Sequence, residues 1–168
     1  MSAPGRPKSE QARACDSAKG RPAGEPIVRR HRGDFHWDDV DLLRYKQEGE
    51  APFRDVTRQV LFEGAEIPAQ LRYFEVAPGG YTTLERHEHV HNVMVIRGSG
   101  HCRVGGQVLD LATHDLVRVP PMTWHQFHAG PDEPLGFLCL VPAQRDRPEL
   151  PSEEERAALL MPPRGDRG

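Results

Sequence analysis

The chain has 168 residues, a length that suits one domain with a sizeable core. Its 25 acidic and 22 basic residues give a formal net charge of −3, and residues 33–144 are more acidic than the rest, which argues against nucleic acid as the main partner. No apolar run is long enough to span a membrane, and no apolar segment at the N-terminus indicates a secretory signal. The three cysteines (Cys15, Cys102 and Cys139) form no close pair, so we expect a reducing, cytoplasmic location.

The two ends of the chain differ in composition from its middle. Residues 1–26 contain seven Pro or Gly and almost no large apolar residue, which predicts a disordered tail. We expect no function for this basic tail. The sequence therefore predicts a tail at 1–26, one β-barrel domain at 27–144, and a C-terminal extension at 145–168.

The middle of the chain consists of short segments in which apolar and polar residues alternate. The expected strands are residues 56–62, 70–76, 93–98, 101–104, 116–120 and 135–141. Gly and Pro residues between them provide turns, and no helical period intervenes. This pattern predicts an all-β fold, a single barrel or sandwich. Cys102 and Cys139 fall in these strands and are expected to be small core residues.

The C-terminal extension contains a helix signal. Ser152 is followed three residues later by Glu155, ahead of the run RAALL. This S-x-x-E arrangement is a capping box and predicts a short helix.

Seven of the nine histidines lie between residues 87 and 128. Neutral imidazole is the commonest ligand for transition metals, and a Glu carboxylate supplies an oxygen ligand. The cluster therefore suggests a metal site, although a histidine-rich surface hairpin has the same composition.

The spacing of these residues resembles the two sequence motifs of the cupin superfamily. The first motif, G-x5-H-x-H-x3/4-E-x6-G, matches positions 79, 85, 87, 91 and 98 in spacing. The second, G-x5-P-x-G-x2-H-x3-N, matches the segment HDLVRVPPMTWH, residues 114–125. In the second motif His114, Met122 and Ala129 stand where the family has Gly, Gly and Asn. The resemblance implies a jelly-roll barrel with one metal ion.

The first motif departs from the family in the order of its ligands. The family has His, His and Glu where this chain has Glu85, His87 and His91. Together with His125, the resemblance implies a ligand set of three nitrogens and one oxygen. A rival set is His87, His89 and His91, because residues at i, i+2 and i+4 share one face of a strand. In the first interpretation His89 lies in a turn and is not a ligand.

Metal-binding cupins include dioxygenases, isomerases, decarboxylases and lyases. The resemblance therefore predicts an enzyme that uses one divalent ion (Fe, Mn, Ni, Cu or Zn) on a small organic substrate, as a dioxygenase or a lyase. The alternatives are a non-catalytic cupin that binds a metal or small ligand as a sensor or storage module, and a barrel without a metal. The family also commonly forms homodimers, and we expect residues 35–62 to contribute to one.

The expected pocket wall is mostly apolar. Tyr81 is the candidate catalytic proton donor, with a packing role as its alternative. Arg72, Arg97 and Arg118 are spread along the chain and are expected to be exposed, so the sequence gives no sign of an anionic substrate.

Overall fold

The computed structural model describes residues 28–46, 52–64 and 67–160. The chain forms two compact units, Met1–Asp39 and Val40–Gly168. In the first, β1 (His31–Gly33) and β2 (His36–Trp37) form a small antiparallel hairpin. The predicted disordered tail at 1–26 lies outside the described residues.

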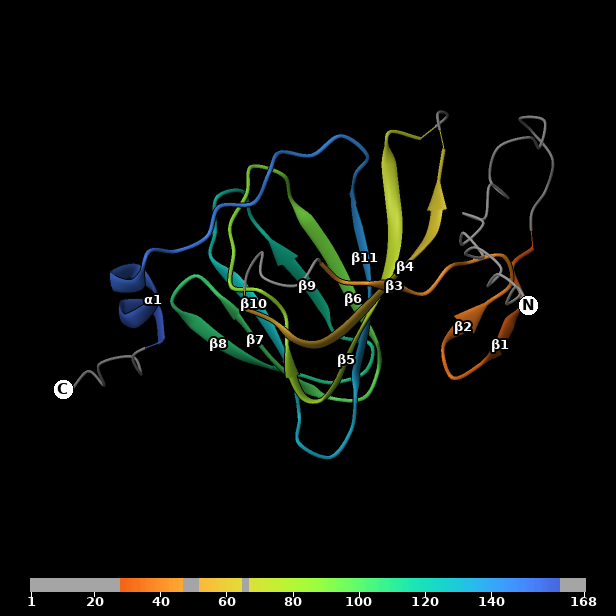
Figure 1. The fold of residues 1–168 in the computed structure, drawn as a ribbon, viewed down its shortest axis with the longest axis horizontal. Coiled ribbons are helices and arrows are strands. Elements are labelled where there is room, and N and C mark those ends of the chain that lie inside the picture. Colours follow the sequence, from red (N-terminus) through yellow and green to blue (C-terminus); the bar gives the residue numbers. More distant parts are fainter. Residues whose placement is uncertain (1–27, 47–51, 65–66, 161–168) are drawn as a thin grey trace, which may run out of the picture. The chain divides into compact units, whose positions relative to one another are not determined.

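The second unit is a curled antiparallel sheet (Figure 1). Its strands are β3 (Leu43–Arg44), β4 (Arg54–Glu63), β5 (Ala69–Tyr81), β6 (His91–Arg97), β7 (Gly100–Val104), β8 (Gln107–Leu111), β9 (Leu116–Val119), β10 (His125–Ala129) and β11 (Leu135–Pro142). The main path runs β8-β7-β10-β5-β11-β6-β9, and β4 pairs with both β3 and β5. The predicted all-β jelly-roll barrel is confirmed.

Strand β5 connects the two halves of the curled sheet. Its first part pairs with β4 and β11. At its end, Tyr81 still pairs with Arg54 of β4, but on the other side it pairs with His128 of β10 in place of β11. The change of partner follows Gly79, which has a φ of +69°, and Gly80, where a Cβ would lie 2.6 Å from the carbonyl oxygen of Arg54. Glycine is needed at both positions because a side chain is disfavoured at the first and would clash at the second.

The chain beyond β5 stays beside β10. The Thr82 amide donates to the Phe127 carbonyl at 2.9 Å, and the His125 amide donates to the Glu85 carbonyl at 2.9 Å. This backbone pairing places residues of the first motif next to the histidine of the second.

The core lies between the two halves of the sheet. Val76, Val95, Val119 and Leu135 have no exposed surface, and Cys102 and Cys139 are buried as expected. The ring of Phe137 stacks on Phe74 at 5.5 Å and on Phe127 at 4.7 Å between ring centroids. These three phenylalanines also line a small cavity beside His91 and His125, so the apolar core extends to the histidine cluster.

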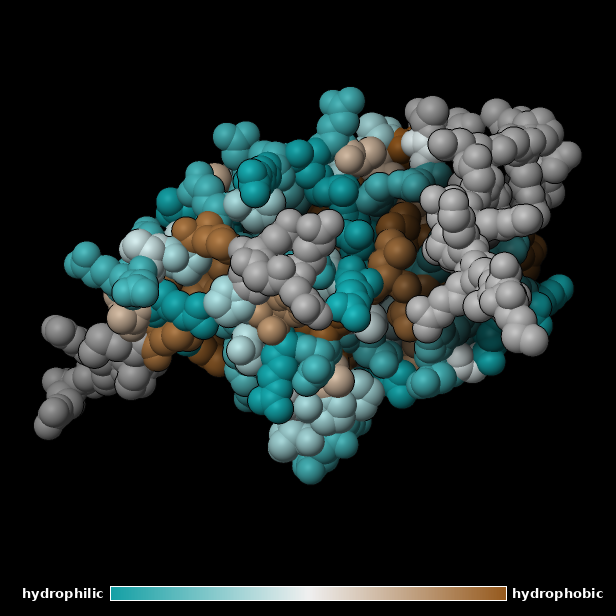
Figure 2. Space-filling view, in the orientation of Figure 1, coloured by the Kyte–Doolittle hydropathy of each residue, from teal (hydrophilic) through white to brown (hydrophobic). Residues whose placement is uncertain are grey.

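The predicted helix is α1 (Glu153–Leu160). Its capping box is formed: the Glu155 amide donates to Ser152 Oγ at 3.2 Å, and the Ser152 amide donates to Glu155 Oε2 at 2.9 Å. None of its residues is buried. Among the described residues, no helix has the length and apolar content needed to cross a membrane. In the view of Figure 2 polar residues cover most of the visible coloured surface, with apolar patches between them.

Candidate metal centre

Three histidines converge at one end of the sheet. The nearest ring nitrogens of His87, His91 and His125 all lie within 4.8 Å of one another. His87 lies in the loop after β5, His91 is the first residue of β6, and His125 is the first residue of β10. Strand pairing therefore fixes the backbone of two of the three.

Hydrogen bonds fix the orientation of two of these rings. Nδ1 of His87 lies 2.8 Å from the carbonyl oxygen of His89, and Nδ1 of His125 lies 3.0 Å from that of Thr123. A carbonyl accepts only, so Nδ1 carries the proton in both rings and Nε2 is left as an electron-pair donor. Nε2 of His87 is buried and has no hydrogen-bond partner among the described residues.

Burial also keeps the cluster uncharged. It lowers the pKa of His87 to about 4 and that of His91 to about 2, and it lowers the pKa of His125 as well. The neighbouring imidazoles act in the same direction on His87 and His91. All three rings are therefore neutral at pH 7, the form that binds a metal. Neutral imidazoles, one with an unsatisfied buried nitrogen, fit a divalent transition-metal ion.

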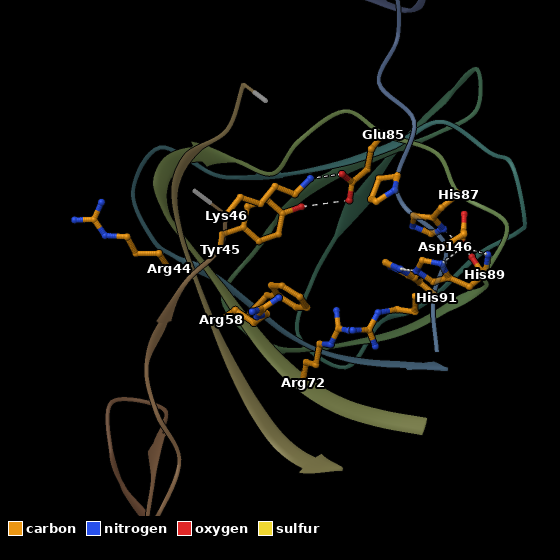
Figure 3. Close-up of a pocket in the computed structure, with 13 residues that line it drawn as sticks. Arg44, Tyr45, Lys46, Arg58, Arg72, Glu85, His87, His89, His91 and Asp146 are labelled. Atoms are coloured by element: carbon orange, nitrogen blue, oxygen red, sulfur yellow. Dashed lines mark hydrogen bonds and ion pairs between the residues drawn. The ribbon is translucent and has the colours of Figure 1, made fainter. Parts of the chain in front are cut away.

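Glu85 lies beside the histidines, but its carboxylate has other partners. It forms an ion pair with Nζ of Lys46 and accepts a hydrogen bond from the Tyr45 hydroxyl at 3.5 Å (Figure 3). Burial, with the charge of Glu85, raises the pKa of Tyr45 well above its usual value, so this phenol stays protonated. The structure thus brings Glu85 to the pocket without including it in the three-histidine group. Its role as a metal ligand stays a prediction.

His89 points toward the cluster rather than into solvent. Its ring stacks on that of His87 at 3.6 Å between centroids, and its Nε2 lies 3.2 Å from Nε2 of His91. Two nitrogens bound to one ion at about 2.1 Å lie roughly 3 Å apart when they subtend a right angle. This spacing would suit His89 as a ligand, but the rival set leaves out His125, which the structure groups with His87 and His91, so the choice of ligands stays a prediction.

Asp146, from the C-terminal extension, holds His89 in place. Its Oδ1 lies 2.5 Å from Nδ1 of His89, and its Oδ2 accepts from the Glu88 amide at 2.7 Å. A carboxylate behind an imidazole orients the ring and increases its basicity toward a metal. Sequence reasoning missed Asp146 because it lies 57 residues from His89 and belongs to no motif.

Tyr81 lies away from this cluster. Its ring is 5.7 Å from that of His128, which in turn stacks on His101 at 4.5 Å. Tyr81 is half-buried and is not among the residues that line the pocket at the histidines. The proton-donor role predicted for Tyr81 therefore has no support from its position, and the tyrosine at the pocket is Tyr45.

The histidines open onto a pocket of about 710 Å³. Its lining residues are Arg44, Tyr45, Lys46, Arg58, Arg72, Phe74, Glu85, His87, His89, His91, Arg145, Asp146 and Pro148. Five of them are basic, a cluster that the sequence did not predict. Arg72 was expected to be exposed, but only 7% of its surface is accessible. The four arginines come from β3, β4, β5 and the C-terminal extension, and only the fold brings them together.

The chain is similar in sequence to a known protein family and to a named enzyme. Residues 72–141 match the family described as "Cupin domain". The chain is 54% identical over 144 residues to a protein from Rhodospirillum rubrum named 1-methylthio-D-xylulose 5-phosphate methylsulfurylase, covering 86% of this chain and 89% of the relative.

Two solved structures have the same fold over most of their length. A cupin 2 conserved barrel protein from Rhodopseudomonas palustris is 52% identical with a TM-score of 0.74, covering 79% of this chain and 91% of the other. A cupin-2 domain protein from Rhodospirillum rubrum is 54% identical with a TM-score of 0.70, covering 78% and 88%. The motifs, the curled antiparallel sheet and these similarities show that the chain belongs to the cupin family.

Proposed function

We propose that this chain is a metal-dependent enzyme that removes the methylsulfur group from a phosphorylated methylthio ketose, as the name of its Rhodospirillum rubrum relative describes. The observation that carries the proposal is the pocket itself, in which a cluster of neutral histidines faces a cationic wall. Such a pocket suits a metal-bound carbonyl compound that carries a phosphate, and the relative's name describes a compound of this kind.

The metal would be held by His87, His91 and His125. For a fourth ligand the sequence predicts Glu85, and the position of His89 makes that histidine a rival. A divalent ion bound there would supply a Lewis acid that polarises a ketone oxygen of the substrate.

The chemistry of the substrate explains why such a site would be useful. In a 1-methylthio 2-ketose the C1–S bond is adjacent to the carbonyl, so an electron pair left on C1 is delocalised onto the carbonyl oxygen. A thiolate that attacks the methylthio sulfur forms a new S–S bond while the C1–S bond breaks, and C1 then takes up a proton. The products of this balanced step are a methyl disulfide and a 1-deoxy ketose.

The protein's own cysteines do not fit the role of that thiolate. Cys102 and Cys139 are buried, and burial raises their pKa to about 11 and about 12. Both are therefore protonated at neutral pH. We propose that the thiol enters as a second substrate.

Lys46, Tyr45 and Glu85 could deliver the proton to C1. They form one partly buried, hydrogen-bonded group on the wall of the pocket that holds the histidines. A Lys ammonium that donates its proton can take up another from solvent, and the Glu85 carboxylate favours that charged form. We assign Lys46 as the general acid and Tyr45 as a hydrogen-bond donor that keeps the Glu85 carboxylate in position.

Purified protein loaded with Mn, Fe, Ni, Cu or Zn in turn would test this proposal. With 1-methylthio-D-xylulose 5-phosphate and a small thiol, we expect proton NMR to show loss of the S-methyl signal and a new C1 methyl signal. His91→Ala and His125→Ala should abolish the conversion, whereas His114→Asn, at an exposed turn, should retain it. No conversion with any of the five metals would overturn the proposal, and thiol-independent oxygen uptake would instead support the dioxygenase that the sequence predicted. Metal binding without turnover of either kind would support the sensor or storage module.

We also propose that the protein forms a homodimer through the region around β3 and β4. Leu42, Leu43 and Phe62 are exposed there to 52%, 39% and 48%. Large apolar side chains exposed on two paired strands favour a protein interface. Light scattering should give twice the mass of the chain, and a monomer at micromolar concentration would contradict this.

A further inference from the structure

One part of the pocket carries positive charge that the described residues do not neutralise. Arg58 lies on β4, Arg72 on β5 and Arg145 in the C-terminal extension, and all three line the pocket (Figure 3 labels the first two). We call these three residues the arginine cluster.

Arg72 is buried, Arg58 is half-buried and Arg145 is exposed, and none of the three forms an ion pair with a carboxylate among the described residues. Arg72 donates through Nε and Nη2 to Oε1 of Gln70, at 3.0 and 2.8 Å. Arg145 donates to the same oxygen at 2.9 Å and to the carbonyl of Pro142 at 2.8 Å. Nε of Arg58 is buried without a hydrogen-bond partner in the described part of the chain. A buried guanidinium is usually paired with a carboxylate, so the neutral amide that Arg72 shares with Arg145 leaves the positive charge of Arg72 unbalanced.

The nearby carboxylates are engaged elsewhere. Glu63 accepts from the side-chain amide of Gln70 and acts on Arg145 only through its charge, without an ion pair; Glu85 pairs with Lys46, and Asp146 pairs with His89. The three arginines also affect one another. Burial lowers the pKa of Arg72 to about 10, and the charges of Arg145 and Arg58 act in the same direction. This arrangement carries an electrostatic cost that a bound anion would remove.

We propose that the arginine cluster binds the phosphate group of the substrate and so sets which end of the substrate faces the histidines. Guanidinium groups bind phosphate oxygens through paired N–H donors, and a dianion would balance the positive charge of the cluster. The identity of the phosphate ester rests on the proposed function, whereas the anion site itself does not.

The chain length of the substrate fits this arrangement. In a pentulose 5-phosphate the phosphate and the C2 carbonyl lie at opposite ends of the molecule. A phosphate on the arginine cluster therefore directs C1 and C2 toward the histidines, which line the same pocket. A ketose without a phosphate would lack this anchor and would bind in more than one orientation.

Calorimetric titration of the metal-loaded protein would test the site. The probes are inorganic phosphate, D-xylulose 5-phosphate and unphosphorylated D-xylulose. We expect the phosphate ester to bind at least about 100-fold more tightly than the free sugar. Arg58→Gln and Arg145→Gln should each weaken the binding of both phosphate probes by about 10-fold or more, because each removes charge-assisted hydrogen bonds. Arg118→Gln, at an exposed position of β9, should leave the binding unchanged.

Further measurements distinguish phosphate binding at the arginine cluster from metal binding and from turnover. The metal content of Arg58→Gln and Arg145→Gln should match that of the wild type, and Arg145→Lys should restore part of the affinity. His91→Ala should still bind inorganic phosphate. If His91→Ala loses phosphate binding while both arginine variants keep it, phosphate binds at the metal and the proposal is overturned. Equal affinity for the ester and the free sugar would overturn it too. A wild type that binds the ester but converts no methylthio substrate would contradict the proposed function and leave the anion site standing.

Discussion

The ammonium of Lys46 forms an ion pair with the carboxylate of Glu85, 39 residues along the chain. Only 19% and 8% of these side chains are exposed, so the pair lies inside the pocket wall. A carboxylate balanced in this way is a weaker candidate for a metal ligand than a neutral imidazole with a free nitrogen. Glu85 therefore has two possible roles: it is either a metal ligand or the ion-pair partner of Lys46.

Metal analysis of single variants distinguishes these roles. We expect Glu85→Gln to retain the metal with reduced activity, because Lys46 already satisfies the carboxylate. His91→Ala should lose the metal, and His89→Ala should bind it more weakly, since Nε2 of His89 lies 3.2 Å from Nε2 of His91. The measurement is the metal-to-protein ratio after dialysis against a weak chelator. Loss of metal from Glu85→Gln, with retention in His89→Ala, would support the ligand set predicted from the sequence.

The stability of the metal-free protein should depend on pH. The pKa of His87 is about 4 and that of His91 about 2 in the folded state, against 6.5 in an unfolded chain. Between these values the unfolded chain binds more protons than the folded one, so the free energy of unfolding falls as the pH drops below 6.5. Each histidine contributes up to about 1.4 kcal/mol per pH unit. Urea denaturation at pH 7, 6 and 5 would measure this slope.

A variant with fewer of these histidines serves as the control. His87→Gln/His91→Gln should have a shallower dependence on pH over the same range. Added metal should also protect the wild type at pH 7 and protect it less at pH 5, because protons compete for the imidazole nitrogens. An unchanged slope in the double variant would show that other groups control the pH dependence.

Replacing the Asp146 carboxylate should lower the metal affinity without removing a metal ligand. Asp146→Asn weakens the hydrogen bonds to His89 and to the Glu88 amide, which hold the pKa of Asp146 below its usual range against the opposing effect of burial. We expect a loss of 10- to 100-fold in metal affinity, the usual effect of removing a carboxylate behind a ligating histidine. Competition with a chromophoric chelator would measure it. Asp115→Asn, on an exposed turn, is the control, and an equal effect there would contradict the assignment.

Two glycines of similar backbone conformation should respond differently to alanine. Gly98 and Gly105 have φ values of +64° and +60°. A Cβ at Gly98 would lie 2.0 Å from the carbonyl oxygen of Pro134, whereas the nearest atom to one at Gly105 is Thr123 Cγ2 at 3.7 Å. Gly105→Ala should therefore cost about 1 kcal/mol for the left-handed backbone alone, and Gly98→Ala about 2 kcal/mol or more. Chemical denaturation would compare them, and equal losses would refute the role of the clash.

The sequence by itself determined the fold and the core of the site. Alternation of apolar residues predicted the strands, and Ser152 with Glu155 predicted the helix, because these signals depend on neighbours within a few residues. Motif spacing predicted that His87, His91 and His125 share one site, and the structure brings the three together, since positions within each motif keep a fixed relation to their strand.

Only the tertiary structure decided the electrostatics of the pocket. Arg58, Arg72 and Arg145 lie far apart in the chain and carry no shared pattern, so their convergence on one pocket was not visible in the sequence. The same holds for the pairing of Glu85 with Lys46 and of His89 with Asp146. Local patterns are set by the periodicity of the backbone, whereas the partner of a charge depends on which distant strands and extensions the fold places beside it.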